Sequence, residues 1–216
     1  MLVKGHNIQG VIFDLDGTLL DSCSIWVQVD IEFFAKRGMT VPDDYSKAIA
    51  HLGLDNAAVY TKKRFNLEES KEDILNEWKS LSVHHYESDI ELKNHAKELI
   101  QHLLDNGVKL AVATANDPEC YEPCLKRHGL YDCFEFIEDV RQFPGGKKTP
   151  DIYLSVAKRL GVEPSHCLVL EDIVVALQSA KLGNFITCGV YESTCKEEKT
   201  KKEISDIYVK DFKELI

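Results

Sequence analysis

Two pairs of acidic residues each close an apolar stretch of the chain and are the first candidates for chemistry. Asp14 and Asp16 close the stretch that begins at residue 10, and Glu171 and Asp172 close the stretch that begins at residue 167. Crowded carboxylates repel one another unless a cation lies among them. Oxygen ligands without accompanying Cys or His favour Mg²⁺ over Zn²⁺. If the two pairs meet in the fold, these four residues predict a Mg²⁺ site.

A hydroxyl, an amide and a lysine could complete such a site. Thr114 ends a hydrophobic stretch, Asn116 follows it, and Lys147 lies in a Gly-rich loop. A lysine and a hydroxyl beside a metal are suited to holding a phosphate group. Each residue alone has an ordinary interpretation: Thr114 as a buried strand residue, Lys147 as a solvated loop lysine, and the acidic pairs as turn or helix-start residues. Their occurrence together favours a site.

The elements that must position these residues alternate between strand and helix over most of the chain. Apolar runs predict strands at 10–15, 109–114, 134–138, 167–170, 185–190 and 206–209, and helical spacing predicts helices at 96–106, 118–128, 151–160, 172–182 and from 197. Such alternation builds a parallel sheet with right-handed crossovers. Since ligands bind beyond the carboxyl ends of the strands in an open parallel sheet, the candidate residues are predicted to share one edge of it.

The intervening residues 21–94 show helical spacing and almost no strand signal, with helices expected at 25–37, 43–62 and 68–87. The predicted fold is therefore α/β: a Rossmann-like parallel-sheet core of residues 1–20 and 95–216, with an inserted all-helical domain of residues 21–94. Segments 20–21 and 93–94 are expected hinges. Segment 51–56 is either a loop that meets the substrate or a plain turn between helices. Trp26 and Trp78 are expected in the core of the insertion, and Trp26 also lies near a hinge.

Four short motifs in this order resemble the signatures of the haloacid dehalogenase superfamily. They are Asp-Leu-Asp-Gly-Thr-Leu at 14–19, Thr114, Gly-Lys-Lys-Thr-Pro-Asp-Ile-Tyr at 146–153, and Leu-Glu-Asp at 170–172. The helical insertion after the first motif is similar to the cap domain of the subgroup that holds phosphoglycolate phosphatase and β-phosphoglucomutase. The resemblance covers nearly the whole chain.

The resemblance implies a role for each matching residue. Asp14 would be the nucleophile that forms an aspartyl phosphate, and Asp16 would be the general acid and base. The metal would be bound by the Asp14 and Asp172 carboxylates, the backbone carbonyl of Asp16, and Glu171 directly or through water. Thr114 and Lys147 complete the implied catalytic set. The implied substrate-binding residues are Gly17, Thr114, Ala115, Asn116 and Lys147.

The chain departs from the family pattern at two motifs. Lys148 stands where a proline is usual, so Lys148 is an alternative to Lys147 as the phosphate-binding lysine. In the fourth motif, Ile173 stands where Ser is frequent and Ala176 where Gly is frequent. These changes affect the surroundings of the implied metal site and leave its carboxylates in place.

The function expected from these motifs is Mg²⁺-dependent hydrolysis of a small phosphorylated metabolite, such as a sugar or organic acid phosphate. A phosphomutase of the β-phosphoglucomutase type would use the same residues, and the Gly17-Thr18 pair favours the phosphatase. A non-catalytic binding protein on this fold should have lost one of the key residues, and none is lost.

Composition and charge limit the classes of partner that the chain is expected to bind. The 216 residues are 44% hydrophobic and carry a formal charge of −10, so they lack the basic footprint of a nucleic-acid-binding protein. No apolar run approaches the roughly 20 residues that span a bilayer, and no secretory signal is recognised, so a cytoplasmic location without membrane contact is expected. Seven scattered cysteines indicate reduced thiols. Residues 196–202 are expected to form a solvated charged face. We expect a monomer or weak homodimer.

Overall fold

The computed structural model describes residues 1–49 and 52–216. The chain forms two compact units, one of Met1–Cys23 with Ile90–Ile216 and the other of Ser24–Asp89. The sequence predicts these boundaries after residues 20 and 94. No helix among the described residues is both long and apolar enough to cross a membrane.

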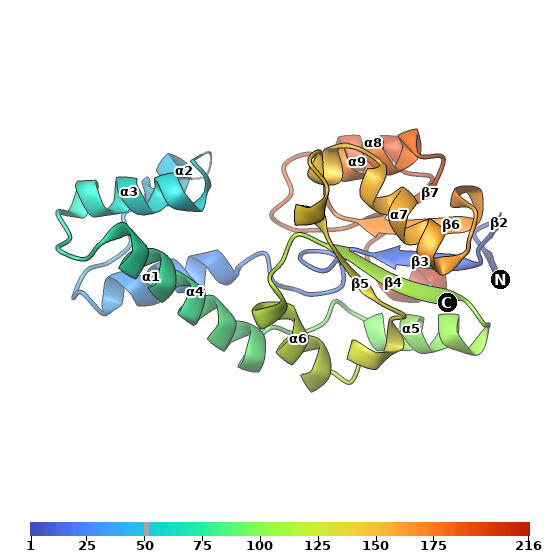
Figure 1. The fold of residues 1–216 in the computed structure, drawn as a ribbon, viewed down its shortest axis with the longest axis horizontal. Coiled ribbons are helices and arrows are strands. Elements are labelled where there is room, and N and C mark those ends of the chain that lie inside the picture. The colour runs from blue at the N-terminus through green and yellow to red at the C-terminus, as the bar shows by residue number, and fades with distance from the viewer. Residues whose placement is uncertain (50–51) are drawn as a thin grey trace. The chain divides into compact units, whose positions relative to one another are not determined.

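The first unit is built on a six-stranded parallel sheet, as the sequence predicted (Figure 1). Its strand order is β5-β4-β3-β6-β7-β8, so the first long strand of the chain lies near the middle of the sheet. The strands read as continuous apolar runs because helices cover both faces of a parallel sheet. The bounds are β3 Gly10–Phe13, β4 Lys109–Thr114, β5 Ile137–Asp139, β6 Cys167–Glu171, β7 Ile186–Val190 and β8 Ile207–Val209.

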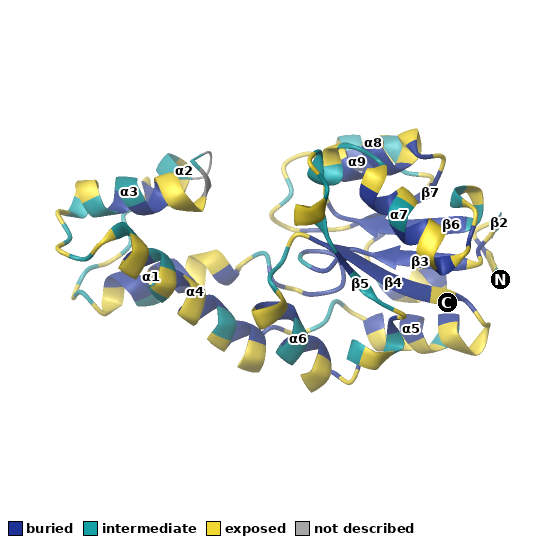
Figure 2. Ribbon diagram, in the orientation of Figure 1, coloured by how far each residue is buried: buried dark blue, intermediate teal, exposed yellow. Residues whose placement is uncertain are grey.

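Helices α5 and α6 lie on one face of this sheet, and α7 and α8 lie on the other (Figure 1). Figure 2 shows the strands almost wholly buried between them. Ile152 and Val156 of α7 pack against Ile12 and Ala111 in a core without solvent access. The bounds are α5 Ala96–Asp105, α6 Pro118–Arg127, α7 Asp151–Leu160, α8 Val174–Leu182 and α9 Glu198–Ile204.

Short elements complete the unit. A two-stranded antiparallel sheet, β1 Leu2–Val3 and β2 His6–Asn7, was not predicted. Single 3-10 turns are η1 Tyr131–Cys133, η2 Val140–Gln142, η3 Gly146–Lys148, η4 Pro164–His166 and η5 Phe212–Leu215. All seven cysteines are free thiols.

One strand and one helix of the first unit begin later in the structure than the sequence predicts. The strand expected at 134–138 begins only at Ile137, because Phe134 turns inward and packs edge-on against Phe13 with ring centroids 5.8 Å apart. The helix expected from Asp172 begins at Val174, and Ile173 before it is extended. Asp172 is therefore held in the turn after β6.

The solvated face expected at 196–202 is wrong for Lys201. The side chain of Lys201 has no solvent exposure, and its Nζ donates a hydrogen bond of 2.7 Å to the carbonyl of Val190. Its stem passes over Gly189, where an added Cβ would lie 3.0 Å from the Lys201 Cγ. Because Gly189 has no side chain, it leaves room for the Lys201 side chain. The run of charged residues alone would suggest that Lys201 is solvated.

The two segments expected to act as hinges are bonded to each other within the first unit. The amide of Asp21 donates to the carbonyl of Glu91 at 2.9 Å, and the amide of Lys93 donates to the carbonyl of Leu19 at 2.9 Å. The Lys93 ammonium lies 3.1 Å from the Asp21 carboxylate and also contacts Glu192.

The second unit is entirely helical in its described residues, as expected for the insertion. Its helices are α1 Ile25–Ala35, α2 Tyr45–Ile49, α3 Gly53–Phe65 and α4 Lys71–Ser88. The single helix expected at 43–62 is wrong, because the structure has two. His51, which begins the predicted substrate loop 51–56, lies outside the described residues, and residues 53–56 form the first turn of α3.

Aromatic side chains hold these helices together. Phe34 packs edge-on against Tyr45 and Phe65, with ring centroids 4.9 and 4.7 Å apart, and Phe33 packs in the same way against Trp78 at 5.6 Å. Such edge-to-face pairs add to the gain from burial. Trp78 is buried, as the sequence suggested, whereas Trp26 is 45% exposed and is not a core residue.

Candidate active site

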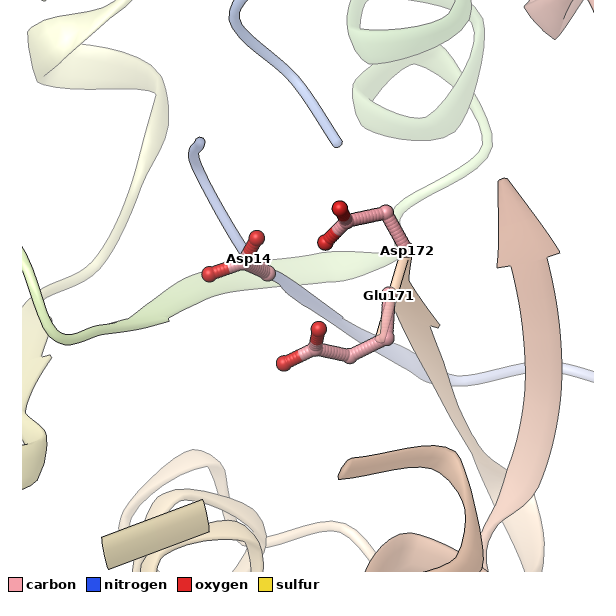
Figure 3. Close-up of side chains that lie close together, drawn as sticks. All are labelled: Asp14, Glu171 and Asp172. Atoms are coloured by element: carbon pink, nitrogen blue, oxygen red, sulfur yellow. The ribbon is translucent and has the colours of Figure 1, made fainter. Parts of the chain in front are cut away.

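Three acidic side chains meet at the carboxyl ends of β3 and β6 (Figure 3). Phe13 pairs with Leu170 in the parallel ladder, and the amide of Asp14 donates to the Leu170 carbonyl at 3.1 Å. This register places Asp14 beside Glu171 and Asp172. One carboxylate oxygen from each of the three lies within 4.8 Å of the others, and all three residues are buried. Two neighbouring strand ends therefore create a cluster of three carboxylates, and Asp16, the fourth residue expected from the sequence, is not a member of it.

The electrostatics of the cluster are unfavourable without a cation. Burial raises the pKa of Glu171, and the neighbouring Asp14 charge raises it further. Burial and the Asp14 charge also raise the pKa of Asp172. The Oε2 atom of Glu171 is buried and has no hydrogen-bond partner among residues 1–49 and 52–216. A buried acceptor without a donor, within reach of two further carboxylates, fits the oxygen ligand set of a divalent metal ion.

Lys147 supplies the one positive charge that directly contacts this cluster in the described structure. Its Nζ lies 2.6 Å from Glu171 Oε1 and also contacts Asp14 Oδ1. Burial would lower the pKa of Lys147, but the Asp14 and Glu171 charges outweigh burial and raise it, so the ammonium stays protonated. Lys148 is exposed. The turn η3 thus brings Lys147, and not Lys148, to the carboxylates.

The loop after β3 encloses the cluster from a second side. Gly17 has φ +79°, and a Cβ there would lie 2.6 Å from Asp172 Oδ2, so both conformation and space require glycine. The hydroxyl of Thr18 donates to Asp172 Oδ1 at 3.4 Å. The Asp16 carboxylate lies outside the three-residue cluster and accepts a hydrogen bond of 2.6 Å from the Ser22 hydroxyl.

The end of β4 presents Thr114, Ala115 and Asn116 at the neighbouring strand end. Thr114 is buried, and its hydroxyl accepts a hydrogen bond of 3.0 Å from the amide of Asn116. The Nδ2 of Asn116 is buried and makes no hydrogen bond within the described parts of the chain. Ala115 is exposed. Because β4 lies directly beside β3, these residues share the edge that carries Asp14.

Sequence reasoning assigned no role in the site to Tyr153 or Ser22, although both bond directly to candidate site residues. The buried hydroxyl of Tyr153 donates to Glu171 Oε1 at 2.9 Å, and Ser22 bonds to Asp16 as described above. Tyr153 had a detectable signal, because it stands two residues into a helix that begins at Asp151 beside the Gly-rich loop. Ser22 had none, since a serine after a strand-end turn is ordinary.

Comparisons with known proteins agree with this arrangement. The family model described as haloacid dehalogenase-like hydrolase matches residues 11–190. Hexitol phosphatase B of Escherichia coli (strain K12) is 26% identical over 180 residues, which cover 82% of this chain and 80% of that protein. The protein named "Putative phosphatase YhcW" of Bacillus subtilis is 28% identical over 175 residues, covering 81% and 79%.

One solved structure has nearly the same fold over its whole length. It is described as a "putative beta-phosphoglucomutase from Thermotoga maritima", and it superimposes with a TM-score of 0.86 over 96% of this chain and 97% of that chain. Its sequence identity is 23%, so this likeness concerns the fold. The α/β core with an inserted helical domain is thereby confirmed.

Proposed function

Because the chain belongs to the haloacid dehalogenase-like hydrolase family, we propose that it is a Mg²⁺-dependent phosphatase that acts on a small phosphorylated metabolite through an aspartyl phosphate at Asp14. The observation that carries the proposal is the cluster of three buried carboxylates against the Lys147 ammonium. Relatives that are named phosphatases support phosphoric monoesters as the substrate class.

The residues fit a bound metal ion. Asp14, Asp172 and the backbone carbonyl of Asp16 would hold Mg²⁺, with Glu171 directly or through water. When bound, the ion would neutralise phosphate charge that this acidic edge would otherwise repel. The unpartnered Oε2 of Glu171 supports this assignment. The absence of Cys and His from the cluster favours Mg²⁺ over softer metals.

Asp14 and Asp16 would carry out the two halves of the reaction. An oxygen of Asp14 forms a bond to phosphorus while the bond from phosphorus to the ester oxygen breaks, and that oxygen takes a proton from Asp16. Asp16, now ionised, accepts a proton from the water that attacks the same phosphorus, which releases phosphate and restores Asp14. Ser22, bonded to the Asp16 carboxylate, would hold the acid in position.

Lys147 and the residues after β4 would hold the transferring group. Lys147 already contacts Asp14, so a phosphoryl group on Asp14 would be within reach of its ammonium. The buried Nδ2 of Asn116 lacks a partner within the described chain and could donate to a phosphate oxygen. Thr114 and Ala115 lie at the same strand end, and Gly17 lets the opposite loop approach.

The test is phosphate release from a panel of sugar, polyol and organic acid phosphates, with Mg²⁺ and with EDTA. We expect metal-dependent release from a few members of the panel, and no release by Asp14→Asn, in which an amide replaces the nucleophile. Circular dichroism should show that this variant remains folded. Release by Asp14→Asn at the rate of the unmodified enzyme would refute the nucleophile assignment. Transfer to a sugar hydroxyl without free phosphate would identify a phosphomutase.

A further inference from the structure

The helical unit contains its own cavity, separate from the carboxylate cluster. The cavity has a volume of about 390 Å³ and is lined from α1, α2, α3 and α4. The lining residues that matter here are Trp26, Asp30, Ser46, Ile49, Leu54 and Trp78. This volume lies within the usual range for small-molecule sites, roughly 300–1,000 Å³. Such sites are mostly apolar with a few placed polar groups, as here.

Asp30 is the unusual member of this lining. It lies in the middle of α1, on the face that also carries the buried Val29 and Phe33, and is only 7% exposed. Within residues 1–49 and 52–216, no side chain forms an ion pair or hydrogen bond with its carboxylate. Burial raises the pKa of Asp30 to about 6, so most of it is still ionised at neutral pH. An ionised carboxylate in an apolar surrounding is costly unless something pairs with it.

The nearby tyrosine does not supply the missing partner. Thr61 donates its hydroxyl proton to the Ala57 carbonyl at 2.8 Å, so in the 2.7 Å contact between Tyr45 and Thr61 the tyrosine is the donor. Burial, with a contribution from the Asp30 charge, raises the pKa of Tyr45 to about 12. The Tyr45 hydroxyl therefore donates its proton to Thr61 and not to Asp30, although the Asp30 charge contributes to the raised pKa of Tyr45.

Trp78 and Trp26 supply the complementary chemistry. Trp78 is 4% exposed, and its Nε1 is buried without a hydrogen-bond partner in the described structure. Trp26 is 45% exposed, so this part of the lining is open to solvent in the helical unit. Aromatic faces attract organic cations, and the attraction is strongest where the contact is desolvated. A carboxylate and two indoles around one cavity thus favour a ligand with a positive charge on an apolar body.

We propose that the helical unit binds a small organic amine in this cavity, with its ammonium group against Asp30 and its apolar body against Trp26 and Trp78. The indole N–H of Trp78 has no hydrogen-bond partner in the described structure and can donate to an oxygen of the same molecule, which points to an amino alcohol.

Tryptophan fluorescence tests the binding directly, because the chain contains only two tryptophans and both line the cavity. The probes are cyclohexylmethylamine and its neutral counterpart cyclohexylmethanol, which themselves do not fluoresce, at pH 7.5. We expect a saturable change in tryptophan emission with the amine. The dissociation constant of the alcohol should be at least about tenfold larger than that of the amine. Equal affinity for the two probes, or no saturable change with either, would overturn the proposal.

A charge-matched pair of variants locates the binding. Asp30→Asn should weaken binding of the amine at least about tenfold, whereas Glu87→Gln, which removes an exposed charge from α4 of the same unit, should leave it unchanged. Thermal unfolding should show that Asp30→Asn is folded, since it removes an unpaired buried charge. Unaltered affinity in folded Asp30→Asn would overturn the proposal. The amine–alcohol comparison in the unmodified protein needs no variant and remains decisive if Asp30→Asn does not fold.

A protein that hydrolyses no phosphate ester would refute the proposed function, yet the fluorescence result would still decide whether the cavity binds amines.

Discussion

Replacing Lys147 with methionine should destabilise the metal-free protein far more than the same change at Lys148. The Lys147 ammonium lies between the Asp14 and Glu171 carboxylates, and its side chain is only 12% exposed. Breaking a buried ion pair by removing one partner costs about 3–5 kcal/mol. For a chain of this length, each kcal/mol shifts the midpoint of thermal unfolding by about 2–4 °C. We therefore expect Lys147→Met to lower Tm by about 6–20 °C in EDTA, by multiplying these two ranges.

The pH dependence of this loss gives an independent check. Glu171 has a folded-state pKa above its unfolded value, so the folded state binds its proton more tightly than the unfolded state. At low pH the Glu171 carboxyl is protonated, so its burial does not include the cost of burying a charge. That cost to stability grows as the pH rises through the folded-state pKa of Glu171. Removing the Lys147 charge raises that pKa further. The Tm difference between Lys147→Met and the unmodified protein should therefore be larger at pH 8 than at pH 5.

The assay is thermal unfolding followed by circular dichroism, in EDTA and in excess Mg²⁺. Lys148→Met is the matched control because Lys148 is exposed, and its effect should stay within about 0.5 kcal/mol. Mg²⁺ should restore part of the loss in Lys147→Met, since a bound cation replaces the missing charge. Equal Tm values for the two variants in EDTA, or a larger loss at Lys148, would refute the placement of Lys147 within the cluster.

Three further changes test other contacts of the site. Gly17→Ala should destabilise the protein and weaken Mg²⁺ binding, because φ is +79° and the new Cβ would lie 2.6 Å from Asp172 Oδ2. Gly38→Ala is the control, because φ there is +67° and a new Cβ would meet no described atom within 4 Å. In thermal unfolding, Gly38→Ala should therefore show only the conformational cost of alanine at positive φ. Tyr153→Phe removes the hydrogen bond to Glu171 and should cost about 1 kcal/mol in EDTA, and a denaturant titration without loss would show that this bond contributes nothing. Addition of Mg²⁺ at about 100 times its dissociation constant should stabilise the unmodified protein by about 2.7 kcal/mol, whereas no Tm shift on calorimetry would contradict a metal site.

The strand ends of the candidate site could be predicted because the relevant signal is local. A run of apolar residues that reaches a carboxylate marks the strand and the region of its end: the strands expected at 10–15 and 167–170 are Gly10–Phe13 and Cys167–Glu171 in the structure. The parallel fold then brings such ends to one edge without further information. The position of Lys147 relative to Lys148 could not be derived in this way, because both lie in one turn and only the course of η3 separates them.

The features that sequence reasoning missed depend on contacts between distant elements. The segment 43–62 reads as one helix from local preference, yet the structure has two helices there, α2 and α3, and Tyr45 of α2 contacts Thr61 of α3. Lys201 lies in a charged run typical of a solvated face, but its side chain is buried over Gly189 of strand β7. Asp30 looks like an ordinary polar helix residue until the surrounding helices close a cavity around it. Local propensity contains none of these tertiary contacts.

The strand order also governs when the protein can fold during its synthesis. Strand β3 pairs only with β4 and β6, which begin at Lys109 and Cys167, while the intervening residues 24–89 form a separate compact unit. At about 5–20 residues per second, the ribosome needs about 5–20 s to pass from residue 13 to residue 109. Throughout this interval the apolar Val11-Ile12-Phe13 segment has no partner strand, and the helical unit is complete only once Asp89 has been added. The insertion thus acts as a delay in biosynthesis, and the nascent chain is most exposed to aggregation, and most dependent on chaperones, before the second half of the sheet emerges.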